Sequence, residues 1–385
     1  MTILFHGAQK LDAAGQVDDF WMTVDGGTIL ATGHGRPPLA PGAAELAIDV
    51  GGRWLTPGFI DLHGHGGGGH SYEDGAEEIL AATAAHRRHG TTRSLISFVA
   101  NPLAELEAQL AVVATLAGAD PLILGSHLEG PYLARERRGA HNAEFLREPQ
   151  PAEIDRLLDA ARGTLRQLTL APELPNALEA TRILVENGVT VAVGHTEATL
   201  EQAQAAFDEG ARLLTHAFNA MPGIHHRAPG PVVAAFDDPR VVLELILDGR
   251  HVHPSVAALA FDSAPGRIAL VTDATAAAGS VDGDYSLGSV TVAVRDGVAM
   301  LRGTTTLAGS TLTQDAALRV AIREAGVSPA DAIAALTTVP AGVLGLEHRY
   351  GMLAAGFAAD AVILDHALTV QAVWADGRPI PRAAT

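Results

Sequence analysis

Two histidines one residue apart, His63 and His65, directly follow a short apolar segment at residues 59–62. Strand side chains alternate in direction, so both imidazoles leave one face at the carboxyl end of the expected strand. Two imidazoles on one face can bind a single metal ion. The glycine-rich residues 66–69 suit a loop whose backbone passes close to a ligand. We therefore predict a metal site here, the alternative being a hydrated turn.

Polar side chains recur where other expected strands end. Glu129 follows the third strand, His195 the fifth, His216 the sixth and Asp273 the eighth. In a parallel barrel the carboxyl ends of all strands meet at one mouth. We therefore expect six side chains to converge: His63, His65, Glu129, His195, His216 and Asp273. Four imidazoles and two carboxylates without a thiolate match a first-row divalent metal.

From residue 57 onward, the elements that must position these residues alternate regularly between expected strands and helices. Apolar segments alternate with stretches of helical periodicity. Strands are expected at 59–62, 92–98, 122–128, 167–171, 190–193, 212–214, 241–247 and 268–271. Helices are expected between them, at 76–89, 104–116, 152–161, 176–187 and 200–209. Eight strand–helix units predict an α/β fold, a (β/α)8 TIM-like barrel spanning residues 57–345.

Both ends of the chain are expected to be β-rich. Short strands are predicted at 20–24, 28–31 and 46–50, with a loop at 36–42, and again at 360–364 and 371–374. We expect residues 1–56 and 346–385 to pair into one small β-sandwich. Inside the barrel segment, residues 279–303 predict a β-hairpin insertion around Arg295-Asp296-Gly297, followed by helices at 312–324 and 329–337.

Composition narrows the class of protein. The 385 residues are 48% hydrophobic, which allows a sizeable core, and their formal charge of −18 argues against nucleic acid or an anionic membrane as a partner. The chain has no cysteine, which excludes disulfides, zinc–thiolate sites and cysteine nucleophiles. We see neither a signal peptide nor an apolar run long enough to cross a membrane, so we expect a cytoplasmic protein.

Other histidines carry less information. His127 faces the same side as Glu129 and is interpreted as a packing residue, with orientation of a metal ligand as the alternative. His225 and His226 lie in a loop bounded by proline and glycine and are expected to be solvated.

Several motifs resemble a known family. The segment Pro57-Gly58-Phe59-Ile60-Asp61-Leu62-His63-Gly64-His65 and residues 356–362 near the C-terminus resemble the metal-dependent amidohydrolase superfamily. Six blocks resemble its N-acetylglucosamine-6-phosphate deacetylases more specifically: residues 127–132, 139–142, 170–173, 194–196, 215–222 and 271–274. The resemblance covers nearly the whole chain. It implies a (β/α)8 barrel with a small β-sandwich built from both termini.

The resemblance also implies roles. Glu129, His195 and His216 would hold a principal divalent ion, and His63 and His65 a second one, with Glu129 bridging. Zinc is the expected metal, with iron, cobalt or manganese as alternatives. Asp273, close to the metal, would take a proton from the attacking water and return it to the departing amine. His141 or His251 would help to stabilise the oxyanion.

The chain has no glycine-rich phosphate loop of the P-loop kind, so positive side chains must bind a phosphate. The resemblance implies that the sugar phosphate contacts a set of residues spread over several loops: Ala140, His141, Asn219, Ala220, Arg227, His251, Leu307, Ala308 and Gly309. Arg227 would reach the site of a neighbouring subunit, which implies a homodimer.

Three functions follow as hypotheses. The first is hydrolysis of N-acetylglucosamine 6-phosphate to glucosamine 6-phosphate and acetate. The second keeps the hydrolysis but changes the substrate to N-acetylgalactosamine 6-phosphate, an N-acyl amino acid or a cyclic amide. The third is a scaffold without activity, against which the full set of expected ligands argues.

Overall fold

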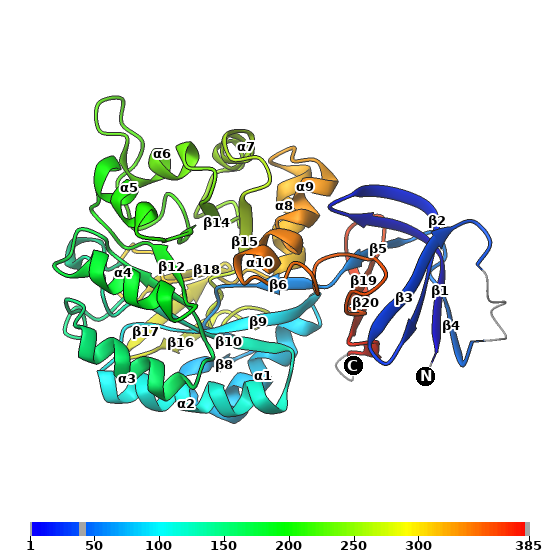
Figure 1. Cartoon of the computed structure of the whole chain (residues 1–385), viewed down its shortest axis with the longest axis horizontal. Coiled ribbons are helices and arrows are strands. Elements are labelled where there is room, and N and C mark those ends of the chain that lie inside the picture. Colours follow the sequence, from blue (N-terminus) through cyan, green and yellow to red (C-terminus); the bar gives the residue numbers. More distant parts are fainter. Residues whose placement is uncertain (1, 38–43, 382–385) are drawn as a thin grey trace.

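The computed structural model describes residues 2–37 and 44–381 and contains a parallel barrel beside a separate terminal sheet (Figure 1). Neighbouring barrel strands pair in parallel in the order in which they occur along the chain. The strands are β6 (Phe59–Asp61), β9 (Thr91–Phe98), β10 (Ile123–Glu129), β11 (Leu165–Leu170), β12 (Thr190–Val193), β13 (Leu213–Leu214), β14 (Val242–Ile246) and β15 (Ile268–Val271). The eight-strand prediction is confirmed.

Backbone contacts just beyond β15 and β6 bring the two ends of the barrel sheet together. Asp273 N donates to His63 O at 2.8 Å, and His65 N donates to Ala274 O at 2.7 Å. The barrel therefore closes at the point where three of the expected site residues leave their strands.

Helices cover the outside of the barrel (Figure 1). They are α1 (Ala76–Arg87), α2 (Leu103–Ala119), α3 (Pro151–Ala161), α4 (Ala177–Glu186), α5 (Leu200–Asp208), α6 (Gly230–Asp237), α7 (Pro254–Ser263), α8 (Gln314–Arg323), α9 (Pro329–Ala334) and α10 (Thr338–Val343), with short turns η2 (Tyr72–Asp74) and η3 (Arg135–Arg137). Helix α5 shows why local sequence fixes a boundary. Thr199 and Gln202 satisfy each other's backbone N–H groups in a capping box.

The terminal sheet joins both ends of the chain in one continuous sheet. Its strands are β1 (Ile3–Asp12), β2 (Gly15–Asp25), β3 (Thr28–His34), β4 (Leu46–Asp49), β5 (Trp54–Pro57), β19 (Ala361–Leu364), β20 (Val370–Ala375) and β21 (Arg378–Pro379). Strand β19 pairs antiparallel with β5, which confirms that the termini pair. The domain boundaries at residues 56 and 346 stay a prediction, and most of the loop expected at 36–42 lies outside the described residues.

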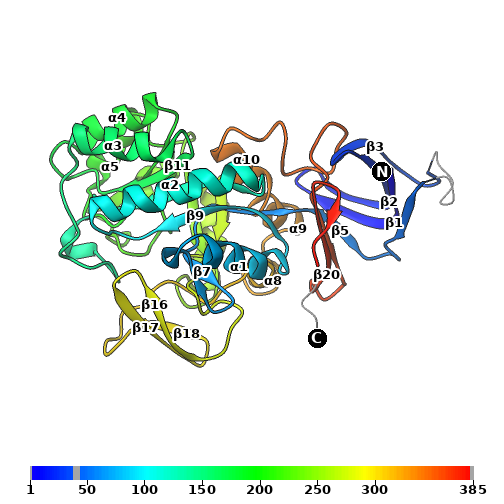
Figure 2. The same cartoon turned by 90° about the horizontal axis from the view of Figure 1, so that it is seen from below.

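The insertion after β15 has three strands rather than the two of a simple hairpin: β16 (Gly283–Leu287), β17 (Val290–Arg295) and β18 (Val298–Leu301). Figure 2 shows it on the barrel, away from the terminal sheet. The expected turn at Asp296-Gly297 joins β17 to β18. We missed β16 because its sequence, Gly-Asp-Tyr-Ser-Leu, is mostly polar, and its pairing with β17 supplies the order. A two-stranded ribbon also forms from β7 (Gly66–Gly67) and β8 (His70–Ser71).

Arg93 connects the barrel to the terminal sheet. It is fully buried on β9 and donates to both carboxylate oxygens of Asp360 at 2.7 and 3.1 Å, and to Asp376 at 2.6 Å. A bidentate contact of this kind fixes orientation as well as distance. None of the helices described is both long and apolar enough to cross a membrane.

Candidate active site and metal centre

The six side chains that we expected to bind metal do converge at the mouth of the barrel. His63 and His65 follow β6, Glu129 ends β10, and the other three follow β12, β13 and β15. His195, His216 and Asp273 adopt positive φ angles of 46°, 26° and 46°. This conformation is costly for residues other than glycine, and such residues concentrate at functional sites. It lets the chain reverse immediately after a strand and bring each side chain back over the mouth.

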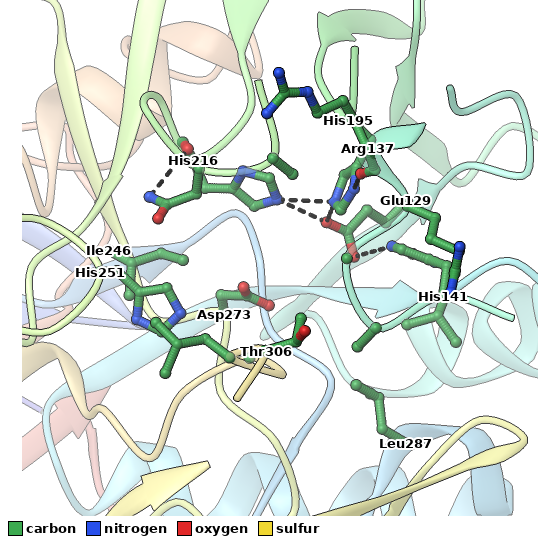
Figure 3. Close-up of a pocket in the computed structure, with 18 of the residues that line it drawn as sticks. Glu129, Arg137, His141, His195, His216, Ile246, His251, Asp273, Leu287 and Thr306 are labelled. Carbon is green, nitrogen blue, oxygen red and sulfur yellow. Dashed lines mark hydrogen bonds and ion pairs between the residues drawn. The ribbon is translucent and has the colours of Figure 1, made fainter. Parts of the chain in front are cut away.

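Glu129 lies at the centre of this group (Figure 3). Its Oε1 is 2.9 Å from His195 Nε2 and 3.0 Å from His216 Nε2, and its Oε2 is 3.2 Å from His65 Nε2. Asp273 Oδ1 lies 3.3 Å from His65 Nε2 and 3.6 Å from His63 Nε2. The donor atoms of His63, His65, Glu129 and Asp273 form one group that can hold a metal ion, and those of Glu129, His141 and His195 form another.

The hydrogen bonds behind the cluster show that it suits a cation. His195 Nδ1 lies 2.8 Å from Arg137 O, which can only accept, so Nδ1 carries a proton and Nε2 is the nitrogen turned toward Glu129. His63 Nδ1 likewise faces a carboxylate oxygen of Glu244 at 3.3 Å. Ring nitrogens that face a carboxylate this closely need a positive charge between them and the oxygen. The residues present therefore fit a divalent metal with nitrogen and oxygen ligands.

The electrostatics of the cluster agree with this. Burial lowers the pKa of His65, but the Asp273 and Glu129 carboxylates outweigh it and raise that pKa to about 9. Burial raises the pKa of Glu129, but the surrounding imidazoles, His63 first, outweigh it and hold the pKa well below its usual value. The carboxylates thus favour positive charge at the imidazoles beside them. A metal ion would supply such a charge.

His141 is built as a neutral hydrogen-bond donor. Burial lowers its pKa to about 4, which leaves the ring uncharged at neutral pH. The backbone N–H of Ala100 donates to its Nδ1 at 3.1 Å, so the ring proton lies on Nε2. That atom is 3.4 Å from Glu129 Oε2, at the edge of the metal cluster. His141 can therefore present an N–H to an oxygen atom placed beside the cluster.

A cavity of about 600 Å³ opens above the cluster, a size that suits a small phosphorylated sugar. Most of the residues that we expected to contact substrate line it: Ala140, His141, Asn219, Ala220, His251, Leu307 and Gly309. His251 donates from Nδ1 to Asp248 at 2.8 Å. Burial lowers the pKa of His251, but the Asp248 hydrogen bond outweighs this and raises it, which favours the cationic form beside an anion.

Two expected contacts lie elsewhere. Arg227 is exposed on a loop that does not line the cavity of its own chain. Ala308 sits between two lining residues, but its side chain is buried in an apolar cluster with Leu287 and Val292 of the insertion. The substrate contacts of both residues stay predictions.

The structure also brings in residues that sequence reasoning missed. Arg137 and Arg138 line the cavity, where they add positive charge. Both sit between the Glu-Gly-Pro and Gly-Ala-His blocks, and that position was the available signal. Glu244 and Gln167 lie below the cluster, fully buried, and contact each other at 2.8 Å. The available signal for Glu244 was a single charged residue in the otherwise apolar strand β14.

His127 orients its surroundings and does not join the ligand cluster. Gly64 N–H donates to Ser97 Oγ at 3.1 Å, which leaves the Ser97 hydroxyl free to donate to His127 Nδ1 at 3.0 Å. His127 Nε2 then donates to Thr169 Oγ1 at 2.9 Å. Both ring nitrogens are therefore occupied. Burial, reinforced by His63, holds the pKa of His127 well below its usual value, so this ring is neutral.

Comparison with known proteins agrees with the geometry. The model of the amidohydrolase family matches residues 54–380. An N-acetylgalactosamine-6-phosphate deacetylase of Escherichia coli is 40% identical, with 98% of this chain and 99% of the relative covered. An N-acetylglucosamine-6-phosphate deacetylase of Vibrio furnissii is 36% identical over 88% of this chain and 86% of the relative. The crystal structure of the Mycobacterium smegmatis N-acetyl-D-glucosamine-6-phosphate deacetylase has a TM-score of 0.92 at 40% identity, covering 99% of this chain and all of that one.

Proposed function

The chain belongs to the amidohydrolase family, and we propose that it hydrolyses the N-acetyl group of N-acetylglucosamine 6-phosphate to glucosamine 6-phosphate and acetate. One observation carries this proposal. The His and carboxylate cluster opens onto a cavity of about 600 Å³ lined by His141, Asn219 and His251. A buried cluster of this kind argues against the scaffold hypothesis. Relatives that match nearly the full chain are named as deacetylases of amino-sugar phosphates.

The chain's own residues account for the proton transfers. Burial raises the pKa of Asp273, but His63 and His65 outweigh it and lower the pKa to about 2, so the carboxylate is ionised and able to accept a proton at neutral pH. Asp273 takes a proton from the water that adds to the acetamide carbonyl carbon. It returns the proton to nitrogen as the C–N bond breaks, which gives a neutral amine and acetic acid, and the acid then loses its remaining proton to solvent to become acetate.

Stabilisation of the carbonyl oxygen falls to His141. Its Nε2–H is held in place from behind by Ala100 and points toward the cluster, where negative charge develops on that oxygen. The pre-set tautomer means that no proton has to move before this hydrogen bond forms.

His63, His65, Glu129, His195, His216 and Asp273 would hold one or two divalent ions, zinc first, with iron, cobalt or manganese as alternatives. Such an ion lowers the pKa of water and polarises a carbonyl. Metal analysis of purified protein should find about one or two ions per chain, and chelation should abolish activity. Active protein free of divalent metal would contradict this assignment.

The phosphate contacts involve a second subunit. Within one chain, His251, Arg137 and Arg138 line the cavity in addition to the histidines of the cluster, while Arg227 lies outside it on an exposed loop. We propose a homodimer in which Arg227 binds the phosphate in the partner's cavity, because its planar guanidinium matches two phosphate oxygens. A cytoplasmic location accompanies this proposal, since a charged sugar phosphate does not cross a bilayer unaided.

N-acetylgalactosamine 6-phosphate is the second candidate substrate, because a relative named for it is 40% identical over 98% of this chain. Acetate release should be measured for both 6-phosphates and for both unphosphorylated sugars, after reloading the protein with zinc. We expect the highest kcat/KM for N-acetylglucosamine 6-phosphate. A higher value for the C4 epimer would transfer the assignment to the second candidate. No release from either phosphate would contradict the proposed function.

A further inference from the structure

Glu244 is a buried carboxylate that the proposed reaction does not use. It lies on β14, is 0% exposed, and does not line the cavity. A carboxylate removed from water is costly unless donors or positive charges surround it. Its position below the metal cluster therefore calls for a specific set of partners.

Both oxygens of Glu244 are engaged. Oε2 lies 3.3 Å from His63 Nδ1 and accepts from the backbone N–H of His216, also at 3.3 Å. Oε1 accepts from Gln167 Nε2 at 2.8 Å. One oxygen thus holds the ring of one expected ligand and the backbone of another, which come from opposite halves of the cluster.

We propose that Glu244 is a positioning residue for the metal centre and acts through His63. By accepting from Nδ1–H it fixes the His63 tautomer whose Nε2 lone pair points into the cluster, 3.6 Å from Asp273 Oδ1 and 3.2 Å from His65 Nε2. Through the His216 N–H it also supports a backbone held at a φ of 26°. This inference rests on the proposed metal-dependent function. It identifies Glu244 as the residue that supports the second ion position, at His63 and His65.

The four histidines of the cluster differ in what holds them from behind. His63 has a carboxylate, and His195 has the uncharged carbonyl of Arg137. Within the described part of the chain, Nδ1 of His65 and of His216 has no hydrogen-bond partner. A carboxylate behind a ligating imidazole makes the ring a better donor to a cation. Glu244 therefore strengthens the ion position at His63 and His65, and it contacts neither the His195 ring nor the His216 ring.

The test is zinc binding by apo protein, measured by competition with a chromophoric chelator and by metal analysis. Glu244→Ala should weaken binding of the second equivalent by about 10- to 100-fold, because loss of such a partner typically costs this much affinity. Binding of the first equivalent should weaken less, because that site loses only the backbone contact at His216. Glu244→Gln should weaken binding of the second equivalent less than the alanine variant does, since its amide oxygen can still accept from His63 once Gln167 turns its unpartnered Oε1 toward the new amide.

Asp61→Asn is the matched control. Asp61 is also a buried carboxylate below the cluster, but it accepts from Thr272 and from the backbone N–H of His63, and it does not contact the ring. The affinity of Asp61→Asn for the second zinc equivalent should stay within about threefold of the wild-type value, because Glu244 still contacts the His63 ring. An equal loss in Asp61→Asn and Glu244→Gln would overturn the proposal, since a general loss of negative charge would then explain both.

Other outcomes are equally decisive. Unchanged second-equivalent affinity in folded Glu244→Ala, or a wild-type protein that never binds a second equivalent, overturns the role of Glu244. If the alanine variant does not fold, Glu244→Gln carries the test, and wild-type affinity in that variant overturns the proposal. These readouts need no substrate. Absent deacetylation by zinc-loaded wild type would instead contradict the proposed function.

Discussion

The barrel mouth and the terminal sheet differ in which residues adopt positive φ angles. At the mouth, His195, His216, Phe218 and Asp273 hold positive φ angles beside a buried cluster of charges. In the terminal sheet, a positive φ falls on residues that tolerate it, such as Asp376 and Gly377 in the turn between β20 and β21, and on Leu368 between β19 and β20, which is the exception. Strained residues thus gather at the mouth, where ligand binding would offset their cost.

The interior of the terminal sheet is apolar, whereas the interior of the barrel below the mouth is polar. The terminal sheet encloses an apolar cluster with Ile3, Phe5, Met22 and Trp374 at its centre. The barrel just below the mouth is polar, with Glu244 among its hydrogen-bonded groups. We therefore expect changes at the mouth to act mainly on activity, and changes in the terminal sheet to act mainly on stability.

The largest expected effect tests the mouth. Asp273→Asn keeps the shape of the side chain but removes its ability to accept a proton, so turnover should fall by about 10²- to 10⁴-fold. Acetate release measures this, and metal analysis with thermal unfolding provides the control. The unfolding temperature should fall, because His63 and His65 stabilise the Asp273 charge in the folded state, so turnover is compared at a temperature where both proteins are folded. Near-normal turnover would show that another residue is the base.

The next prediction tests the terminal sheet. Phe5 is 1% exposed and packs edge-on against Trp374, with ring centroids 5.1 Å apart. Phe5→Ala should lower the free energy of unfolding by about 3–5 kcal/mol. Urea unfolding measures the loss, and kcat/KM of the folded fraction should stay near wild type. Leu30→Ala is the control, because Leu30 is 56% exposed on β3 and should cost under about 0.5 kcal/mol. A large drop in kcat/KM for folded Phe5→Ala would break the comparison.

The third prediction concerns the exposed loop at the mouth. A charge-assisted phosphate contact is worth roughly 1.5–3 kcal/mol, so Arg227→Ala should raise KM for the 6-phosphate by about ten- to a hundred-fold. KM for the unphosphorylated sugar should barely change. His226→Ala, in the same exposed loop, should leave both values near wild type.

Mixing tests whether Arg227 acts across a dimer interface. A mixed dimer of Arg227→Ala and Asp273→Asn chains would have one cavity with both residues intact, so mixing should restore part of the activity. A monomer at assay concentration, or no rescue on mixing, would refute the shared site. Equal losses on phosphorylated and unphosphorylated sugars would refute the phosphate role.

The smallest expected effect concerns charges outside the cavity. Asp315 on α8 accepts from Thr313 Oγ1 at 2.6 Å and Arg319 at 2.8 Å, and lies 3.2 Å from His89 Nδ1. Burial raises the pKa of Asp315, but these partners outweigh it and lower the pKa from 3.8 to about 2. A lowered folded-state pKa stabilises the protein above the unfolded pKa, and this stability is lost as pH falls toward 2.

Asp315→Asn should therefore cost about 2 kcal/mol near pH 6. The difference from wild type should shrink as the pH falls from about 4 toward 2. Urea unfolding across this range measures it, and kcat/KM at pH 7 serves as the control. A difference that does not depend on pH would show that the aspartate stabilises the fold by packing and not by its charge.

The sequence alone determined the barrel and the strand-end residues, for a physical reason. Apolar strands and helical stretches have different periods, and parallel strands all point their carboxyl ends the same way. Residues that follow those ends, such as His65, Glu129 and His195, must therefore share the mouth. The predicted strands 190–193 and 268–271 coincide with β12 and β15. The terminal pairing was predictable because β-rich ends flanked one barrel.

Only the tertiary structure decided how deep each side chain lies in the barrel and which residues it contacts across the barrel. His127 and Glu129 leave the same face of β10, but two residues of rise place His127 lower, where Ser97 and Thr169 occupy both of its nitrogens. Glu244 lies 181 residues from its partner His63. Alternation along β14 can predict that it is buried, but only the closed barrel decides which ring it meets. Periodicity specifies the direction of a side chain, and packing decides its neighbours.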